Sequence, residues 1–210
     1  MPLHLLTGYM IIYVTLRMAI ETKFSVEDIT ILLRNSGWWD KRTSTMIPNL
    51  SWGLLNHEAD FCVIKNTGYL TEIEIKRSFE DLKKDFKKDV FHDDDRVSRF
   101  YYCLPISLKE KAEKLFKEQK EKLINFYGCE PDSVTVEHIP AVIYYDEEGK
   151  LTTNGGWPER FKTRKLFLEE RDKIGRLMSL RYWDVVEKHN KLLLEQKETD
   201  GEIQCDSNAK

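Results

Sequence analysis

Acidic and basic side chains alternate with apolar ones in the segment Glu72-Ile-Glu-Ile-Lys76. Because side chains alternate across a β-strand, Glu72, Glu74 and Lys76 would share one face of a strand. Glu58 and Asp60 would likewise share one face of a segment that precedes it. The sequence therefore predicts a cluster of carboxylates with one ammonium group beside it.

Such a cluster would favour a bound cation. Carboxylates a few ångströms apart repel each other, and burial adds to the cost of keeping them charged. Oxygen ligands of this kind suit Mg²⁺ or Mn²⁺. A metal held there would polarise a phosphate group and lower the pKa of a bound water, which is the chemistry of phosphodiester hydrolysis. Lys76 would position or activate that water, or neutralise charge that develops on the phosphate.

The same residues have a second interpretation that involves no chemistry. A Glu-Ile-Glu-Ile-Lys strand is also typical of an amphipathic strand with one solvated face, and Glu–Lys pairs across strands stabilise such a face modestly. On this interpretation the chain would be an interaction protein that exposes the acidic face of its strand to water. The Glu-x-Lys triplet taken alone is compatible with both interpretations.

Helical and extended patterns alternate along the chain and give the scaffold that would position these residues. Ser25 with Asp28 forms a capping-box signature ahead of an apolar helical pattern, and Ser78 with Asp81 repeats it. Segment 37–56 is expected to be a loop with short extended pieces. The predicted elements are helices over Ser25–Asn35, Phe79–Val90, Leu108–Tyr127 and Leu166–Leu194, and strands over Ala59–Lys65, Tyr69–Lys76, Phe100–Pro105 and Val134–Tyr145.

The two strands nearest the acidic residues are separated by a short turn that contains Gly68. Apolar, β-branched runs around such a turn predict a β-hairpin, and pairing within this hairpin would bring Asp60 close to Glu74. The alternation of helices and strands along the chain predicts an α/β fold with a central mixed β-sheet flanked by helices.

Length and composition fit one globular domain with appendages, since the chain has 210 residues, 33% of them charged, and a net charge of −3. We expect an N-terminal strand or arm over 1–24, a single domain over 25–195 and a flexible polar tail over 196–210. The alternative for the first residues is an extension outside the fold. The net charge counts mildly against a nucleic-acid binder, although binding surfaces are local.

The cysteines and the N-terminal segment bear on the compartment. The four cysteines are widely spaced and form no CxxC pair, so we expect reduced thiols in a cytoplasmic protein rather than a zinc site or disulfides. The apolar stretch from Leu5 to Ala19 contains Arg17 and is shorter than the roughly 20 residues that span a bilayer. No membrane association is therefore expected.

A longer run of residues has the order of a known family. The run consists of Glu58-Ala-Asp60, Glu72-Ile-Glu74-Ile-Lys76-Arg-Ser78, Asp81, Asp85-Phe-Lys-Lys88 and Arg99-Phe-Tyr-Tyr-Cys-Leu-Pro105. It resembles the PD-(D/E)xK nuclease superfamily, in particular the MmcB-like DNA-repair branch with its phage and mobile-element relatives. The similarity covers 56–108 best and Arg171–Trp183 more loosely. Ala59 stands where the superfamily motif has a Pro.

The resemblance implies a restriction-endonuclease-like core that binds Mg²⁺ or Mn²⁺. The implied metal ligands are Asp60, Glu74 and the Ile75 carbonyl, and the implied catalytic lysine is Lys76. A further carboxylate, which the family takes from its first helix, has two candidates here, Glu27 and Glu58. The implied function is hydrolysis of phosphodiester bonds in DNA, in repair or in phage or mobile-element DNA metabolism, with RNA as an alternative substrate and an oligomer possible. The alternative is a non-catalytic nucleic-acid-binding or scaffold protein with the same fold.

Other polar residues near the motif have both a functional and a structural interpretation. Ser78 would contact phosphate or cap a helix, Asp85 would reach the site or favour the helix dipole, and His57 would support the acids or do neither. Lysines at i,i+4 spacing would grip a nucleic-acid backbone or form a solvated helix face. The candidate nucleic-acid contacts are Ser78, Lys84, Lys87, Lys88, Arg160, Lys162, Arg164 and Lys165, and the candidate supporting residues are Glu72, Asp85 and His57.

Overall fold

The computed structural model describes residues 22–51, 53–87, 94–127, 141–154 and 163–207. The chain divides into two compact units, Met1–Leu166 and Phe167–Lys210. The first unit contains a β-sheet and the helices that cover it, and the second contains the helix α5 (Leu168–Ser207). Most of the expected N-terminal strand or arm, residues 1–24, lies outside the described residues.

Six strands form one mixed sheet in the order β1-β2-β3-β4-β5-β6. The strands are β1 (Ser44–Leu50), β2 (Ala59–Lys65), β3 (Leu70–Ile75), β4 (Val97–Pro105), β5 (Ala141–Tyr145) and β6 (Leu151–Thr153). β3 pairs with β4 and β4 with β5 in parallel, whereas the other neighbouring strands are antiparallel. The α/β fold with a central mixed sheet and the β2–β3 hairpin are thereby confirmed.

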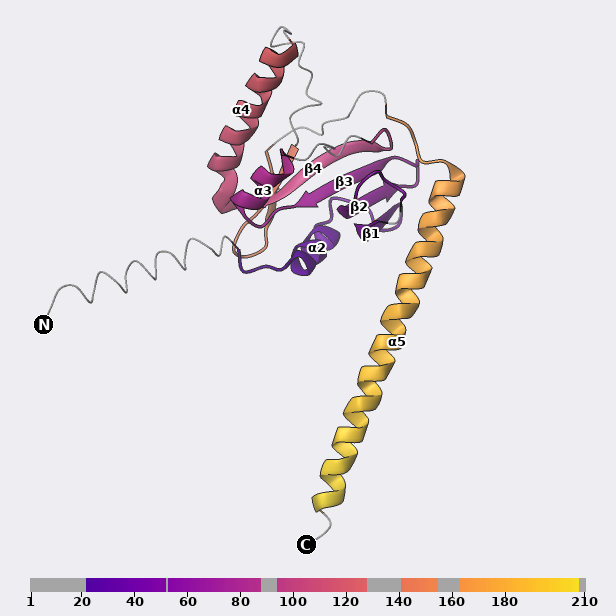
Figure 1. Cartoon of the computed structure of the whole chain (residues 1–210). Coiled ribbons are helices and arrows are strands. Elements are labelled where there is room, and N and C mark those ends of the chain that lie inside the picture. The colour runs from indigo at the N-terminus through magenta and orange to yellow at the C-terminus, as the bar shows by residue number, and fades with distance from the viewer. Residues whose placement is uncertain (1–21, 52, 88–93, 128–140, 155–162, 208–210) are drawn as a thin grey trace, which may run out of the picture. The chain divides into compact units, whose positions relative to one another are not determined.

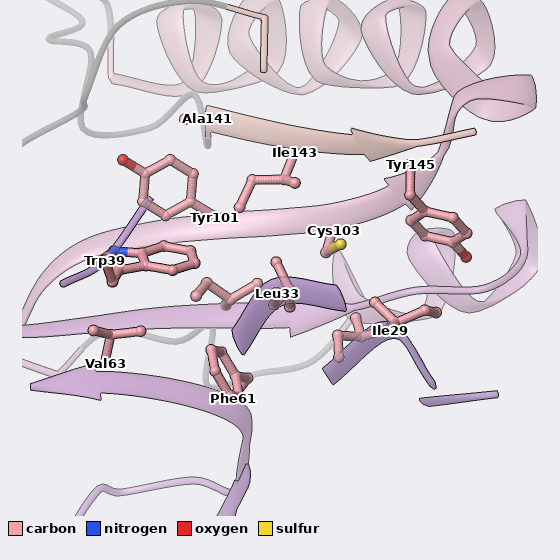
Figure 2. Close-up of a cluster of buried hydrophobic side chains, with 12 residues drawn as sticks. Ile29, Leu33, Trp39, Phe61, Val63, Tyr101, Cys103, Ala141, Ile143 and Tyr145 are labelled. Carbon is pink, nitrogen blue, oxygen red and sulfur yellow. The ribbon is translucent and has the colours of Figure 1, made fainter. Parts of the chain in front are cut away.

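One face of the sheet packs against α2 (Val26–Asn35). Ile29 and Leu33 of this helix lie among Phe61, Tyr101 and other alternate residues of the central strands, as Figure 2 shows. This face contains no ionisable member of the predicted cluster, because those residues have the opposite parity along their strands. The apolar core on this side holds the strands in register, and the ionisable residues lie on the other face.

The N-terminus of α2 confirms the capping box that the sequence predicts. The Ser25 hydroxyl oxygen accepts a hydrogen bond from the Asp28 backbone N–H at 3.1 Å, and the Asp28 carboxylate accepts one from the Ser25 N–H at 2.9 Å. These reciprocal bonds satisfy backbone donors that the first turn of a helix leaves without partners. Local sequence therefore fixes where this helix starts.

The opposite face of the sheet is covered by α3 (Phe79–Asp85) and α4 (Lys109–Tyr127), which lie on the other side of the sheet from α2 (Figure 1). The Phe116 ring of α4 stacks on the Tyr102 ring of β4 with centroids 5.8 Å apart. Phe86, directly after α3, contacts both rings. Helices and aromatic rings therefore enclose the strand face on which the chemistry is expected.

The two edge strands of the sheet are the ones that the sequence does not delimit. β1 falls in segment 37–56, which is expected to be a loop with short extended pieces, and the short β6 follows a turn at Gly149, whose φ is +81°. Pro48 in β1 has no backbone N–H to donate, so it is tolerated in a strand at an edge. β1 is one of the expected short extended pieces, and pairing with β2 rather than the local pattern sets its bounds.

Two further boundaries differ from the sequence-based expectation, and a third is only partly covered by the described residues. The helix expected to reach Val90 ends at Asp85, with Phe86 as its C-cap, and the Phe86 ring contacts Tyr102 and Phe116. β4 begins at Val97, before the expected start. β5 begins at Ala141, and the expected strand residues before it lie outside the described part of the chain.

α5 is longer than the sequence suggests. It extends to Ser207, through most of the segment 196–210 that is expected to be a flexible tail. The segment is rich in Glu, Gln and Lys, which are polar but also good helix formers. Within the described ranges, no helix is both long and apolar enough to cross a membrane.

Candidate active site

Every residue of β3 is buried, including its acidic ones. The exposed fraction is 0% for Glu72 and 5% for Glu74. A strand with a solvated acidic face would expose both carboxylates. The interpretation of β3 as an amphipathic strand with a water-facing side is therefore wrong, and burial of these acids requires compensating partners.

Asp60, at the start of β2, lies against the end of β3. Its carboxylate accepts a hydrogen bond from the Ile75 backbone N–H at 2.8 Å. The antiparallel register pairs Phe61 with Ile73, and one further step of that register places Asp60 opposite Glu74. The Ile75 side chain belongs to the apolar core on the far face, so its backbone alone takes part in the site.

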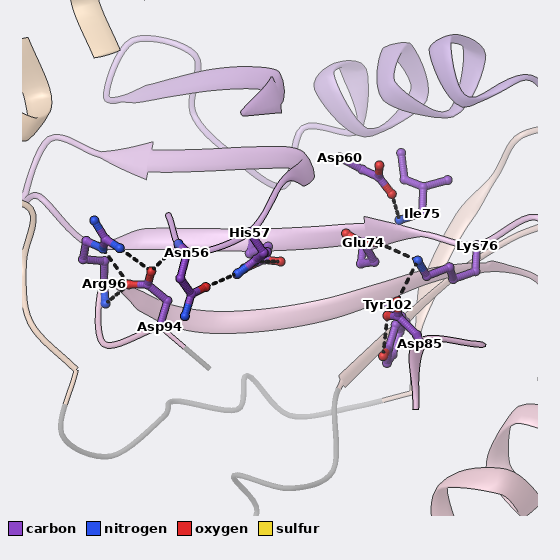
Figure 3. A network of polar contacts seen from close by, with 11 residues as sticks. Asn56, His57, Asp60, Glu74, Ile75, Lys76, Asp85, Asp94, Arg96 and Tyr102 are labelled. Atoms are coloured by element: carbon purple, nitrogen blue, oxygen red, sulfur yellow. Dashed lines mark hydrogen bonds and ion pairs between the residues drawn. The ribbon is translucent and has the colours of Figure 1, made fainter. Parts of the chain in front are cut away.

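Lys76 follows β3 directly and is 5% exposed. Its Nζ lies 2.6 Å from Glu74 Oε1 and 3.2 Å from Asp85 Oδ1. Figure 3 shows the ammonium group in contact with both carboxylates, with Asp60 and Ile75 above Glu74 and Lys76 and with Asp85 and Tyr102 below them. The fold thus brings the three central residues of the motif together at one end of β3.

Asp85 and Tyr102 complete the arrangement around Lys76. Asp85 is the last residue of α3 and is 1% exposed, and its Oδ2 accepts a hydrogen bond from the Tyr102 hydroxyl at 2.9 Å. The sequence singles out Asp85 as a candidate, but it gives Tyr102 no role. The sequence does not reveal the parallel pairing of Tyr102 with Glu74, which puts both side chains on one face.

Burial and charge shift the pKa of two residues at this end of the sheet. Burial raises the pKa of the Asp60 carboxyl, although the Ile75 N–H and the Lys76 charge act in the opposite direction. Burial by itself would lower the pKa of Lys76, but the neighbouring carboxylates, Glu74 foremost, outweigh it, so the pKa lies above its ordinary value. Lys76 is therefore a cation at neutral pH, and Asp60 carries an incompletely compensated charge.

A second polar cluster lies nearer the start of β3 on the same face. Glu72 Oε1 is 2.8 Å from His57 Nε2, and the other ring nitrogen of His57 contacts the Asn56 side-chain oxygen. The Asn56 backbone N–H donates to Asp94 Oδ2 at 3.1 Å, and Arg96 forms an ion pair with Asp94. Figure 3 shows both clusters. The second cluster holds the segment before β2 against β3 through Glu72 and against the residues before β4 through Asp94.

Ser78 caps α3. Its hydroxyl oxygen accepts a hydrogen bond from the Asp81 backbone N–H at 3.1 Å. Ser78→Ala is therefore expected to lower the free energy of unfolding by about 1 kcal/mol, and Ser78→Asn, which can still cap, to preserve it. Urea denaturation of the three proteins measures the difference. A phosphate contact would instead appear as weaker DNA binding by the alanine variant at unchanged stability.

The basic candidates divide between the two ends of β3. Lys84 and Lys87 are exposed on or just after α3, beside the end that carries Lys76. Arg164 pairs with Asp95 at 3.1 Å. Lys88, Arg160 and Lys162 lie outside the described residues.

Lys165 lies at the opposite end of β3 from Lys76. Its ammonium group is 5.3 Å from the centroid of the Tyr69 ring, and the following residue, Leu166, donates its backbone N–H to the Gly68 carbonyl. At about 3.3 Å of rise per strand residue, Tyr69 is roughly 20 Å from Lys76. The fold therefore does not place the segment at 164–165 beside the carboxylates.

The candidates for a further carboxylate are both exposed. Glu58 immediately precedes β2, and Glu27 lies in the first turn of α2. In the described part of the chain, no three His, Cys, Asp or Glu side chains are grouped so as to hold a metal ion. The ligand set that the motif implies is smaller, with two carboxylates and the Ile75 carbonyl.

Comparisons with known proteins give little additional information. No protein-family model and no curated protein matches the chain. Among solved structures, the chain is similar to a protein of unknown function from Silicibacter pomeroyi, with a TM-score of 0.37 and 13% identity over 67% of this chain and 81% of that one. The function of the chain therefore has to be inferred from its own residues.

Proposed function

We propose that this chain is a metal-dependent nuclease of the PD-(D/E)xK type that hydrolyses phosphodiester bonds in DNA, in repair or in phage or mobile-element DNA metabolism. The observation that carries the proposal is the meeting of Asp60, Glu74 and Lys76 at one end of β3. Asp60 bonds the backbone next to Glu74, and Glu74 contacts Lys76 at 2.6 Å. Perturbed ionisable groups gathered in this way are typical of functional sites.

The residues present fit a divalent cation such as Mg²⁺ or Mn²⁺. Asp60, Glu74 and the Ile75 carbonyl supply oxygen atoms only, and Mg²⁺ commonly takes one or two protein carboxylates and fills its remaining positions with water and phosphate. Burial raises the pKa of Asp60, which means that its negative charge is poorly compensated by the protein alone. A cation at this position would compensate it.

The chemistry follows from how the chain holds its charges. A metal bound here would polarise the phosphate and lower the pKa of a water molecule. Lys76, held as a cation, would stabilise the negative charge that develops on the phosphate oxygens. Its raised pKa favours this electrostatic role over that of a general base, which would have to be neutral to accept a proton.

The direct test is a cleavage assay on single-stranded, duplex and branched DNA, and on RNA of the same sequences, with Mg²⁺, Mn²⁺ or EDTA. The proposal expects cleavage with either metal and none with EDTA. The substrate that is cut fastest identifies the substrate class. Absence of cleavage on every substrate, by a protein shown to be folded, would overturn the proposal.

The exposed lysines beside Lys76 are the expected contacts to the phosphate backbone. Lys84→Ala and Lys87→Ala should each weaken DNA binding and reduce the slope of log affinity against log salt by about one. Arg164→Ala and Lys165→Ala are the matched controls, because their positions lie at the far end of β3. Fluorescence anisotropy in EDTA at several salt concentrations measures all four variants. A reduced slope in the control variants alone would place the DNA at the other end.

A second candidate function is a nucleic-acid-binding protein without catalysis. One observation favours it, namely that Lys76 contacts both Glu74 and Asp85 and so balances part of the acidic charge without a metal. This alternative expects DNA binding that depends neither on a divalent metal nor on Lys76. The same anisotropy measurement, made with Mg²⁺ and with EDTA, distinguishes it from the nuclease.

A further inference from the structure

Lys76 has two acidic partners that come from different elements of the fold. Glu74 belongs to β3 and approaches the ammonium group to 2.6 Å, whereas Asp85 belongs to α3 and approaches it to 3.2 Å. All three residues are buried, with exposed fractions of 5% or less. An ammonium group in such surroundings depends on its partners, because water cannot replace a lost one.

Glu74 has a second role in the proposed nuclease site, on which this inference rests. If its carboxylate also binds a divalent cation, the metal and Lys76 compete for the same negative charge, and the two cations repel each other. The contact between Glu74 and Lys76 would then weaken at the moment when Lys76 must be in place. Another carboxylate that does not bind the metal would keep the lysine there.

Asp85 has the features that such a residue needs. Its Oδ1 faces Lys76, and its Oδ2 is occupied by the Tyr102 hydroxyl at 2.9 Å. The Tyr102 ring is itself held by stacking on Phe116, with an angle of 14° between the planes, and by contact with Phe86. Tyr102 and the rings packed against it therefore orient Asp85, whose contacts with Tyr102 and Lys76 are drawn in Figure 3.

We propose that Asp85, oriented by Tyr102, is the positioning residue for Lys76 and holds its ammonium group when Glu74 engages a metal ion. Glu74 would thus bind the metal while Asp85 holds the lysine, because one carboxylate would perform both tasks poorly. Tyr102 acts one step further out, through its hydrogen bond to Asp85.

The test follows the Lys76 ammonium group directly by ¹H–¹⁵N NMR of lysine side chains, with the resonance assigned from its absence in Lys76→Arg. The measured quantity is the exchange rate of the ammonium protons with water, which rises when the group loses a charged partner. Glu74→Gln imitates a Glu74 whose charge is engaged elsewhere. We expect a small rise in that variant while Asp85 is intact, a further rise of about tenfold or more when Asp85→Asn is added to it, and an intermediate further rise when Tyr102→Phe is added instead.

A rise that is complete in Glu74→Gln alone, so that adding Asp85→Asn changes the exchange rate no further, would overturn the proposal. Thermal unfolding establishes that each variant is folded at the measuring temperature, and Tyr102→Phe decides the question if Asp85→Asn does not fold. None of these readouts requires nuclease activity, so failure of the proposed function leaves the test intact. In an active enzyme, Asp85→Asn should reduce kcat while leaving the KM for DNA unchanged.

Discussion

Lys76→Ala is expected to reduce the rate of phosphodiester cleavage by about 10²- to 10³-fold, the usual effect of removing one group that stabilises transition-state charge. The ammonium group is buried and oriented by two carboxylates, so neither water nor a neighbouring lysine can take its place. The measurement is single-turnover cleavage at saturating metal, which isolates the chemical step from DNA binding.

The same substitution has a cost in stability that must be separated from the effect on catalysis. Removing one partner from a buried ion pair typically costs about 3–5 kcal/mol, because the other charge is left without compensation. Lys76→Met, which keeps most of the side-chain volume, and Lys83→Ala, on the partly exposed surface of α3, are the matched controls. A folded Lys76→Ala protein that cleaves at the wild-type rate would contradict the assignment.

Asp60→Asn is expected to abolish metal-dependent cleavage and, in EDTA, to raise the free energy of unfolding at neutral pH. Burial raises the pKa of Asp60 above 3.8 in the folded state. Folding therefore favours the protonated carboxyl, and the associated stability is present below the unfolded pKa and lost as pH rises through the folded pKa. Asparagine carries no charge and can still accept the hydrogen bond from the Ile75 N–H.

The gain in the free energy of unfolding from Asp60→Asn should thus be absent at low pH. It should grow as the pH rises from the unfolded pKa through the folded pKa of Asp60. Thermal unfolding between pH 3 and pH 8 measures it, with Asp81→Asn as the exposed control. Added Mn²⁺ should reverse the order, because a ligand that binds the folded state stabilises it and the variant has lost a metal ligand. A variant that Mn²⁺ stabilises as strongly as the wild type would show that Asp60 does not bind the metal.

The sequence by itself predicted which polar residues share a face. Alternation along a strand puts Glu72, Glu74 and Lys76 on one side, and the structure confirms it for β3, because Ile73 and Ile75 belong to the apolar core on the other face. The Ser25 cap and the β2–β3 hairpin were equally predictable. These features depend on residues close together in the chain, so local sequence contains the information that specifies them.

Tertiary structure alone decided which partners those residues have. The parallel pairing of β3 with β4 puts Tyr102 next to Glu74, and the early end of α3 leaves Asp85 facing Lys76. Tertiary structure also made β1 a strand and placed Lys165 at the far end of β3. A local pattern specifies the face on which a side chain lies, but not the element that covers that face. Contacts between segments distant in the chain depend on how the whole core packs, and no periodicity within a single segment encodes them.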